Sequence, residues 1–129
     1  MTLFTKIIRG EIPCHKIAEN ETCFAFLDIN PLTKGHTLVV PKKEVDYLFD
    51  VEDTLLQDLT LFSKQVAIAI QKAVPCIRIG VAVIGLEVPH AHIHLIPMNH
   101  VGDLNFSRPK LQLSHEELAE IAAAIKVHL

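Results

Sequence analysis

Apolar residues recur at helical spacing in three parts of the chain. A short stripe at positions 3, 4, 7 and 8 stops before Gly10, which predicts a short N-terminal helix. A longer stripe at positions 55, 59, 62, 66, 69 and 73 predicts a helix over about residues 51–73, with Asp50 as its N-cap. Residues 114–117 (Ser-His-Glu-Glu) form a capping box and predict a third helix after them.

Short runs of strand-forming residues separate these helices. They lie at residues 14–19, 22–27, 36–40, 77–84 and 90–96. Residues 22–27 are apolar on both faces and predict a buried strand. The last two runs are neighbours in sequence, so we expect them to pair antiparallel. Strands and helices do not alternate regularly, which favours an α+β fold with a mostly antiparallel sheet.

Three histidines alternate with apolar residues in the last of these runs. On a strand, His90, His92 and His94 would share one face, while Ala91, Ile93 and Leu95 would face the core. Three interpretations fit this spacing. The row could be a half-exposed polar face, a metal site, since histidine is the commonest metal ligand, or a histidine nucleophile flanked by two orienting histidines.

Composition narrows the class of protein. The 129 residues suit one domain, 1–129, and half of them are hydrophobic, as in a globular protein. The net charge of −3 argues against a nucleic-acid partner. No apolar run is long enough for a bilayer, so we expect no membrane partner. Cys14, Cys23 and Cys76 show no C-x-x-C spacing, which fits a reducing, cytoplasmic location.

The motif and three further segments resemble the histidine triad (HIT) family. Residues 90–96 match the family motif His-φ-His-φ-His-φ-φ at every position, where φ is apolar. Residues 3–13 resemble the family's N-terminal helix, 24–31 its nucleoside-binding strand, and 35–43 the strand with a fourth histidine. The closest similarity is to the nucleoside phosphoramidase-like branch. The resemblance implies a HIT-like fold with a five-stranded sheet, one long helix and shorter ones, and a homodimer.

The resemblance also implies a site for a purine nucleotide. His92 would be the nucleophile, with His90 and His94 beside it and His36 behind the triad. Asp28 would hold the ribose hydroxyls. The base pocket would be lined by apolar side chains: Leu3, Phe4, Ile7, Phe26 and Ile29.

Three parts of the chain differ from patterns found in the family. Just before the triad, Leu86 and Glu87 stand where the family usually has Gln and Ser or Thr, so a carboxylate replaces a hydroxyl that would touch phosphate. The family's common Asn on the preceding strand is also absent, in the region of Ile79. Thr2 and Thr5 occupy the positions of a C-x-x-C zinc pair found in some members, so we expect no metal there and no cofactor.

The resemblance implies hydrolysis at the α-phosphorus of purine nucleotides, such as nucleoside 5′-phosphoramidates or related adenylates. The reaction would pass through a covalent nucleotidyl-histidine. The alternatives are a nucleotide-binding protein with little turnover, a dinucleoside polyphosphate hydrolase and, least favoured, a zinc hydrolase.

Overall fold

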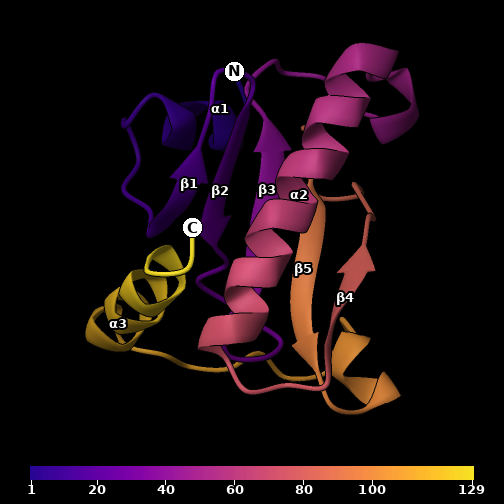
Figure 1. Cartoon of the computed structure of the whole chain (residues 1–129). Coiled ribbons are helices and arrows are strands. Elements are labelled where there is room, and N and C mark those ends of the chain that lie inside the picture. Colours follow the sequence, from indigo (N-terminus) through magenta and orange to yellow (C-terminus); the bar gives the residue numbers. More distant parts are fainter.

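A single antiparallel sheet organises the chain, and the computed structural model describes all 129 residues. The strands lie in the order β1-β2-β3-β5-β4, with every neighbouring pair antiparallel (Figure 1). The strands are β1 Lys16–Glu19, β2 Cys23–Leu27, β3 Thr37–Pro41, β4 Arg78–Ala82 and β5 Ile93–Met98. The helices are α1 Leu3–Ile8, α2 Asp53–Ala73 and α3 His115–Lys126, with 3-10 turns at Leu48–Asp50 and Val101–Leu104. The predicted α+β class, five-stranded sheet and long helix are confirmed.

The two faces of the sheet carry separate apolar clusters. Strand β2 is buried throughout, and its alternate side chains divide between the clusters. Cys23, Ala25 and Leu27 join the larger cluster, which α2 and α3 cover, while Phe24 and Phe26 pack under α1 on the other face. Figure 1 shows the long α2 lying across the middle strands. The prediction that this strand is buried on both faces is correct.

The helix ends are set by capping and by one buried valine. The capping box at Ser114 begins α3 as predicted. The proposed Asp50 N-cap of α2 is wrong, because Asp50 lies in a 3-10 turn and the helix begins at Asp53. Val51 lies between them with an extended backbone and a buried side chain, so the helix begins only after this residue. No helix combines the length and apolarity needed to cross a bilayer.

The histidine strand begins later than its alternating pattern predicts. Strand β5 starts at Ile93, so His90 and His92 precede it and only His94 lies within it. Pairing stops at this point on both sides of β5, because the last pair with β3 is Val39 and Ile93 and the last pair with β4 is Ala82 and His94. Pro97 lies inside β5 rather than ending it. Pro97 follows the three residues of β5 that pair with β3. Its missing N–H therefore removes no hydrogen bond from that ladder.

Candidate active site

The three histidines still gather on one face of the sheet. Ile93 and Leu95 point into the cluster beneath α2, as predicted. The histidine rings lie on the opposite face, and those of His92 and His94 have centroids 4.9 Å apart. His90 is fully buried, while His92 and His94 are each about 7% exposed. Polar rings this deeply buried need hydrogen-bond partners, and these partners determine where each ring carries its proton.

His92 presents an unprotonated nitrogen to its surroundings. Its Nδ1 lies 2.7 Å from the carbonyl oxygen of His90, which can only accept, so Nδ1 carries the proton. In the neutral ring Nε2 is then a lone pair. Nε2 of His92 has no hydrogen-bond partner in the chain. Every fully buried side-chain nitrogen and oxygen does have one, so Nε2 of His92 must be accessible to solvent. His92 therefore presents an accessible imidazole lone pair at the surface of the site.

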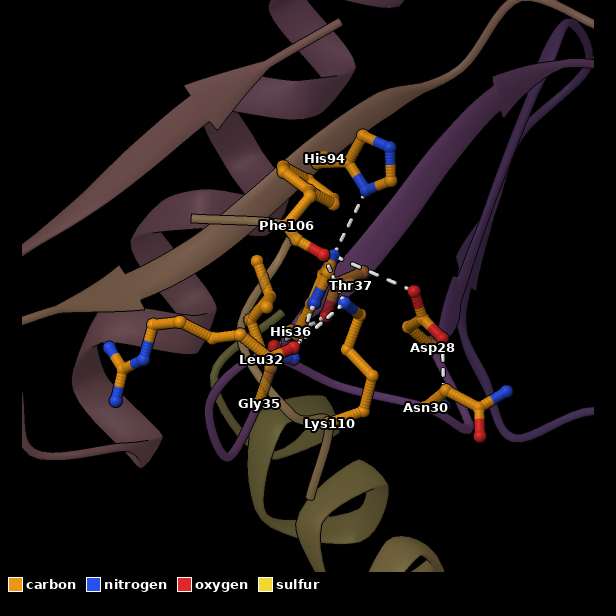
Figure 2. Close-up of polar contacts among 10 residues, drawn as sticks. Asp28, Asn30, Leu32, Gly35, His36, Thr37, His94, Phe106 and Lys110 are labelled. Carbon is orange, nitrogen blue, oxygen red and sulfur yellow. Dashed lines mark hydrogen bonds and ion pairs between the residues drawn. The ribbon is translucent and has the colours of Figure 1, made fainter. Parts of the chain in front are cut away.

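A second chain of hydrogen bonds fixes the proton of His94. The backbone N–H of Leu32 donates to Nδ1 of His36 at 3.0 Å, so His36 carries its proton on Nε2. That Nε2–H donates to Nδ1 of His94 at 3.0 Å, which leaves the His94 proton on its own Nε2 (Figure 2). His94 therefore offers an N–H donor beside the lone pair of His92.

Burial keeps this pair of rings neutral. Loss of solvent lowers the pKa of His36 to about 3, helped by the nearby His94 and Lys110. The same cause, with His92 second, lowers the pKa of His94 to about 4. Because both values lie far below 7, the hydrogen bonds described above hold at neutral pH.

Asp28 closes the row of polar groups at the end of β2. Its Oδ1 accepts the N–H of Asn30 at 2.8 Å, and its Oδ2 lies 3.7 Å from Nε2 of His36 (Figure 2). Burial raises the pKa of this carboxyl, and the hydrogen bond from Asn30 opposes the rise. A desolvated carboxylate with a free oxygen is suited to accept hydroxyl donors from a ligand.

A cavity of about 460 Å³ lies against this row. It is lined by 20 residues, of which 13 are hydrophobic. The structure brings together nine of the predicted site residues here: Leu3, Phe4, Ile7, Phe26, Asp28, Ile29, Glu87, His92 and His94. His90 and His36 are absent from the lining, because His90 lies beneath α1 and His36 lies behind His94. The mixture of a large apolar surface and a few convergent polar groups is typical of a small-molecule site.

Phe106 completes the cavity and was not predicted from the sequence. Its ring stands edge-on to His94 with centroids 4.8 Å apart, and to His36 at 6.1 Å (Figure 2). It belongs to the irregular stretch after β5, which shows no apolar periodicity. Its proximity depends on how that stretch folds back, which no local pattern specifies.

Asp28, His36 and His94 also have the composition of a metal site. Their donor atoms all lie within 4.8 Å of one another. The hydrogen bonds nevertheless oppose coordination. The Leu32 N–H occupies Nδ1 of His36, so its Nε2 must keep a proton, and a protonated nitrogen has no lone pair for a metal. These three residues therefore fit a proton-ordered network better than a metal.

An antiparallel sheet that holds buried, hydrogen-bonded histidines beside an apolar cavity defines a small α+β protein with a histidine-lined candidate site. The sequence model of the HIT domain matches residues 9–101, and the chain belongs to the HIT family. The adenosine 5′-monophosphoramidase of Schizosaccharomyces pombe is 35% identical, over 96% of this chain and 98% of its own. A HIT-like protein of Borreliella burgdorferi is 34% identical, over 98% and 97% of the two chains.

Solved structures show the same architecture. The crystal structure of a Hit-like protein from Bartonella henselae, involved in cell-cycle regulation and containing an unknown ligand, superposes with a TM-score of 0.86. The two sequences are 32% identical, and the match covers 99% of this chain and 96% of that one. The family resemblance and the HIT-like fold expected from it are thus confirmed.

Proposed function

We propose that this protein hydrolyses purine nucleotides at the α-phosphorus, with nucleoside 5′-phosphoramidates or related adenylates as substrates. The observation that carries the proposal is the state of His92. Its Nδ1–H is held by a backbone carbonyl, so its Nε2 lone pair opens toward the cavity. A neutral imidazole is a good nucleophile at pH 7, since its ordinary pKa is about 6.5. The phosphoramidase activity of the S. pombe relative supports this choice of substrate.

The cavity suits the rest of such a substrate. Phe4 and Phe26 are buried in its wall, whereas Leu3 and Ile29 are 46% and 58% exposed and offer apolar surface at its rim. A flat base would cover these rim side chains and remove them from water. Two neighbouring ribose hydroxyls would donate to Asp28, whose raised pKa they would lower again.

The reaction would proceed in two displacements. Nε2 of His92 attacks phosphorus, the bond from phosphorus to the leaving nitrogen breaks, and the Nε2–H of His94 donates a hydrogen bond to the departing group. The leaving nitrogen takes up one proton from solvent, which receives one back from the attacking water in the second displacement, and departs as the amine. Water then attacks phosphorus, the bond to His92 breaks, and the water gives up one proton. The protons therefore balance over the cycle.

A second candidate is a nucleotide-binding protein with little turnover. The observation that favours it is the pair Leu86 and Glu87 at the cavity, because neither side chain can donate a hydrogen bond to phosphate at neutral pH. A dinucleoside polyphosphate hydrolase is a third possibility, since it would use the same nucleophile on a more highly charged leaving group.

Single-turnover and steady-state assays with adenosine 5′-phosphoramidate would test the proposal. Wild type should turn over, and His92→Asn should lose several orders of magnitude in kcat, because no other group can supply the nucleophile. AMP should still bind to the variant with an affinity near that of wild type. Binding without turnover in wild type would favour the second candidate, and near-normal rates in His92→Asn would refute the mechanism.

We also propose that the protein is a homodimer. Strand β4 is an edge of the sheet, and its Val81 is 62% exposed, as is neighbouring Ile77 at 67%. Ile68 of α2, which lies near Ile77, is 46% exposed, and Leu61 of the same helix is 60% exposed. An unpaired edge strand with adjacent apolar side chains favours pairing with a second copy.

A further inference from the structure

The nucleophile lies on a segment that the sheet does not hold. Residues 90–92 precede β5, and their backbone makes two hydrogen bonds to other backbone groups, from Ala91 N–H to the Val45 carbonyl at 2.6 Å and from His90 N–H to the Val88 carbonyl at 2.8 Å. The carbonyl of His90 nevertheless decides which nitrogen of His92 carries the proton. Whatever holds His90 in place therefore also sets the state of His92.

Both ring nitrogens of His90 are bound. Nε2 lies 2.8 Å from the carbonyl oxygen of Pro41, which can only accept, so Nε2 carries the proton. Nδ1 is then a lone pair, and the hydroxyl of Thr2, 2.8 Å away, must donate to it. The same hydroxyl oxygen accepts the N–H of Thr5, since Thr2 is the N-cap of α1. Thr2 thus joins the first helix to the histidine row.

Glu44 holds Thr2 from the other side. One of its oxygens accepts the backbone N–H of Thr2 at 2.6 Å and the hydroxyl of Thr5 at 2.8 Å. These two donors lower the pKa of Glu44 to about 2, so it remains a carboxylate at neutral pH. Because the Thr5 hydroxyl donates to Glu44, the hydroxyl hydrogen of Thr2 is free to point at His90.

We propose that Thr2 is a positioning residue for the reaction proposed above. Together with the full burial of the His90 ring, donation from the Thr2 hydroxyl keeps His90 neutral, with the proton on Nε2, and so holds the His90 carbonyl against the Nδ1–H of His92. Glu44 supports this role by fixing the backbone of Thr2. The consequence for catalysis rests on the proposed function, whereas the proton positions on the two rings do not.

The chemistry of N-caps offers a sharp test. Asp, Asn and Ser are all good N-caps, so each should preserve α1. Ser keeps the hydroxyl donor. Asn has the same shape as Asp but carries an N–H donor. Thr2→Asp instead places an acceptor against the lone pair of His90. His90 should then take a second proton on Nδ1 and become a cation. The titratable groups that face it are Glu44 and His92, and the added carboxylate should raise the pKa of His90.

Imidazole ¹⁵N NMR would read the proton positions of His90 and His92 without turnover, and kcat and KM would be measured in parallel. In Thr2→Asp we expect a protonated His90 at pH 7, a smaller fraction of His92 with its proton on Nδ1, and a kcat lowered by about tenfold with little change in KM. Thr2→Asn, the matched control, and Thr2→Ser should resemble wild type in all these measurements.

Two outcomes would overturn the inference. In the first, Thr2→Asp leaves His90 in its neutral Nε2–H form. In the second, it protonates His90 while the proton of His92 and the kcat stay as in wild type. If wild type does not cleave adenosine 5′-phosphoramidate at all, the proposed function fails alone, because the NMR measurements still decide what Thr2 does.

Discussion

Glu87 brings a second carboxylate to a cavity that is proposed to hold an anion. It is exposed, it lines the cavity together with Asp28, and it forms no ion pair with any lysine, arginine or histidine. Its charge is also one of the smaller causes that raise the pKa of Asp28. Nothing in the chain therefore neutralises Glu87, and we expect it to repel charge on the leaving group of a nucleotide.

The size of this repulsion follows from the exposure of the side chain. At a separation of ~4 Å, two unit charges repel by about 1 kcal/mol in water and by about 4 kcal/mol at an effective dielectric constant near 20. Because Glu87 is exposed, the value near 1 kcal/mol applies, which is roughly a fivefold change in rate per charge. A polyphosphate leaving group carries several charges and a neutral amine carries none. Glu87→Ser should therefore improve cleavage of a diadenosine polyphosphate at least about fivefold more than that of adenosine 5′-phosphoramidate.

The assay compares kcat/KM for these two substrates in wild type and in Glu87→Ser. Low ionic strength should enlarge the effect, since salt screens exposed charges. Glu21→Ser removes the same charge from the turn before β2, at the opposite end of that strand from Asp28, and should leave the ratio unchanged. An unchanged ratio in Glu87→Ser as well would show that Glu87 does not face the phosphates, and the expected preference for amine leaving groups would have to be abandoned.

Three further predictions concern stability, metal and assembly. The lowered pKa values of His36 and His94 mean that the unfolded chain binds more protons between about pH 4 and 6.5, so the free energy of unfolding should decrease as the pH is lowered through that window; Asp28, whose pKa is raised, contributes in the opposite sense. Urea titrations at several pH values would measure this, and a smaller slope is expected for His36→Gln. Turnover should survive a strong chelator and dialysis, and a tightly held equivalent of zinc whose removal abolishes activity would contradict this. Light scattering at micromolar concentration should give about twice the chain mass of 14.4 kDa, and a uniform monomer would refute the dimer.

Local patterns predicted the elements whose burial is continuous. The both-faces apolar run of β2 and the capping box of α3 are encoded within a few residues, so each could be predicted without knowledge of its neighbours. The start of α2 could not be predicted in this way. Asp50 is a residue type that favours the N-cap, but it lies in a 3-10 turn, and the buried Val51 separates this turn from the helix. The contact of Phe106 with His94 could not be predicted for a similar reason, because it depends on the path of the folded chain after β5.

The start of the histidine strand is the most informative error. Alternation alone extends a strand over all three histidines, but a ladder also needs paired hydrogen bonds, and pairing stops at Ile93 on the β3 side and at His94 on the β4 side. If β5 continued through His92, the His90 carbonyl would point along the sheet toward a neighbouring strand. Outside the ladder, that carbonyl is free to accept the Nδ1–H of His92 instead. The break in pairing that makes the periodicity a poor guide here therefore leaves His92 with an ordered proton and an accessible lone pair. It also means that His90 is held by groups far from it in the sequence, the Thr2 hydroxyl and the Pro41 carbonyl.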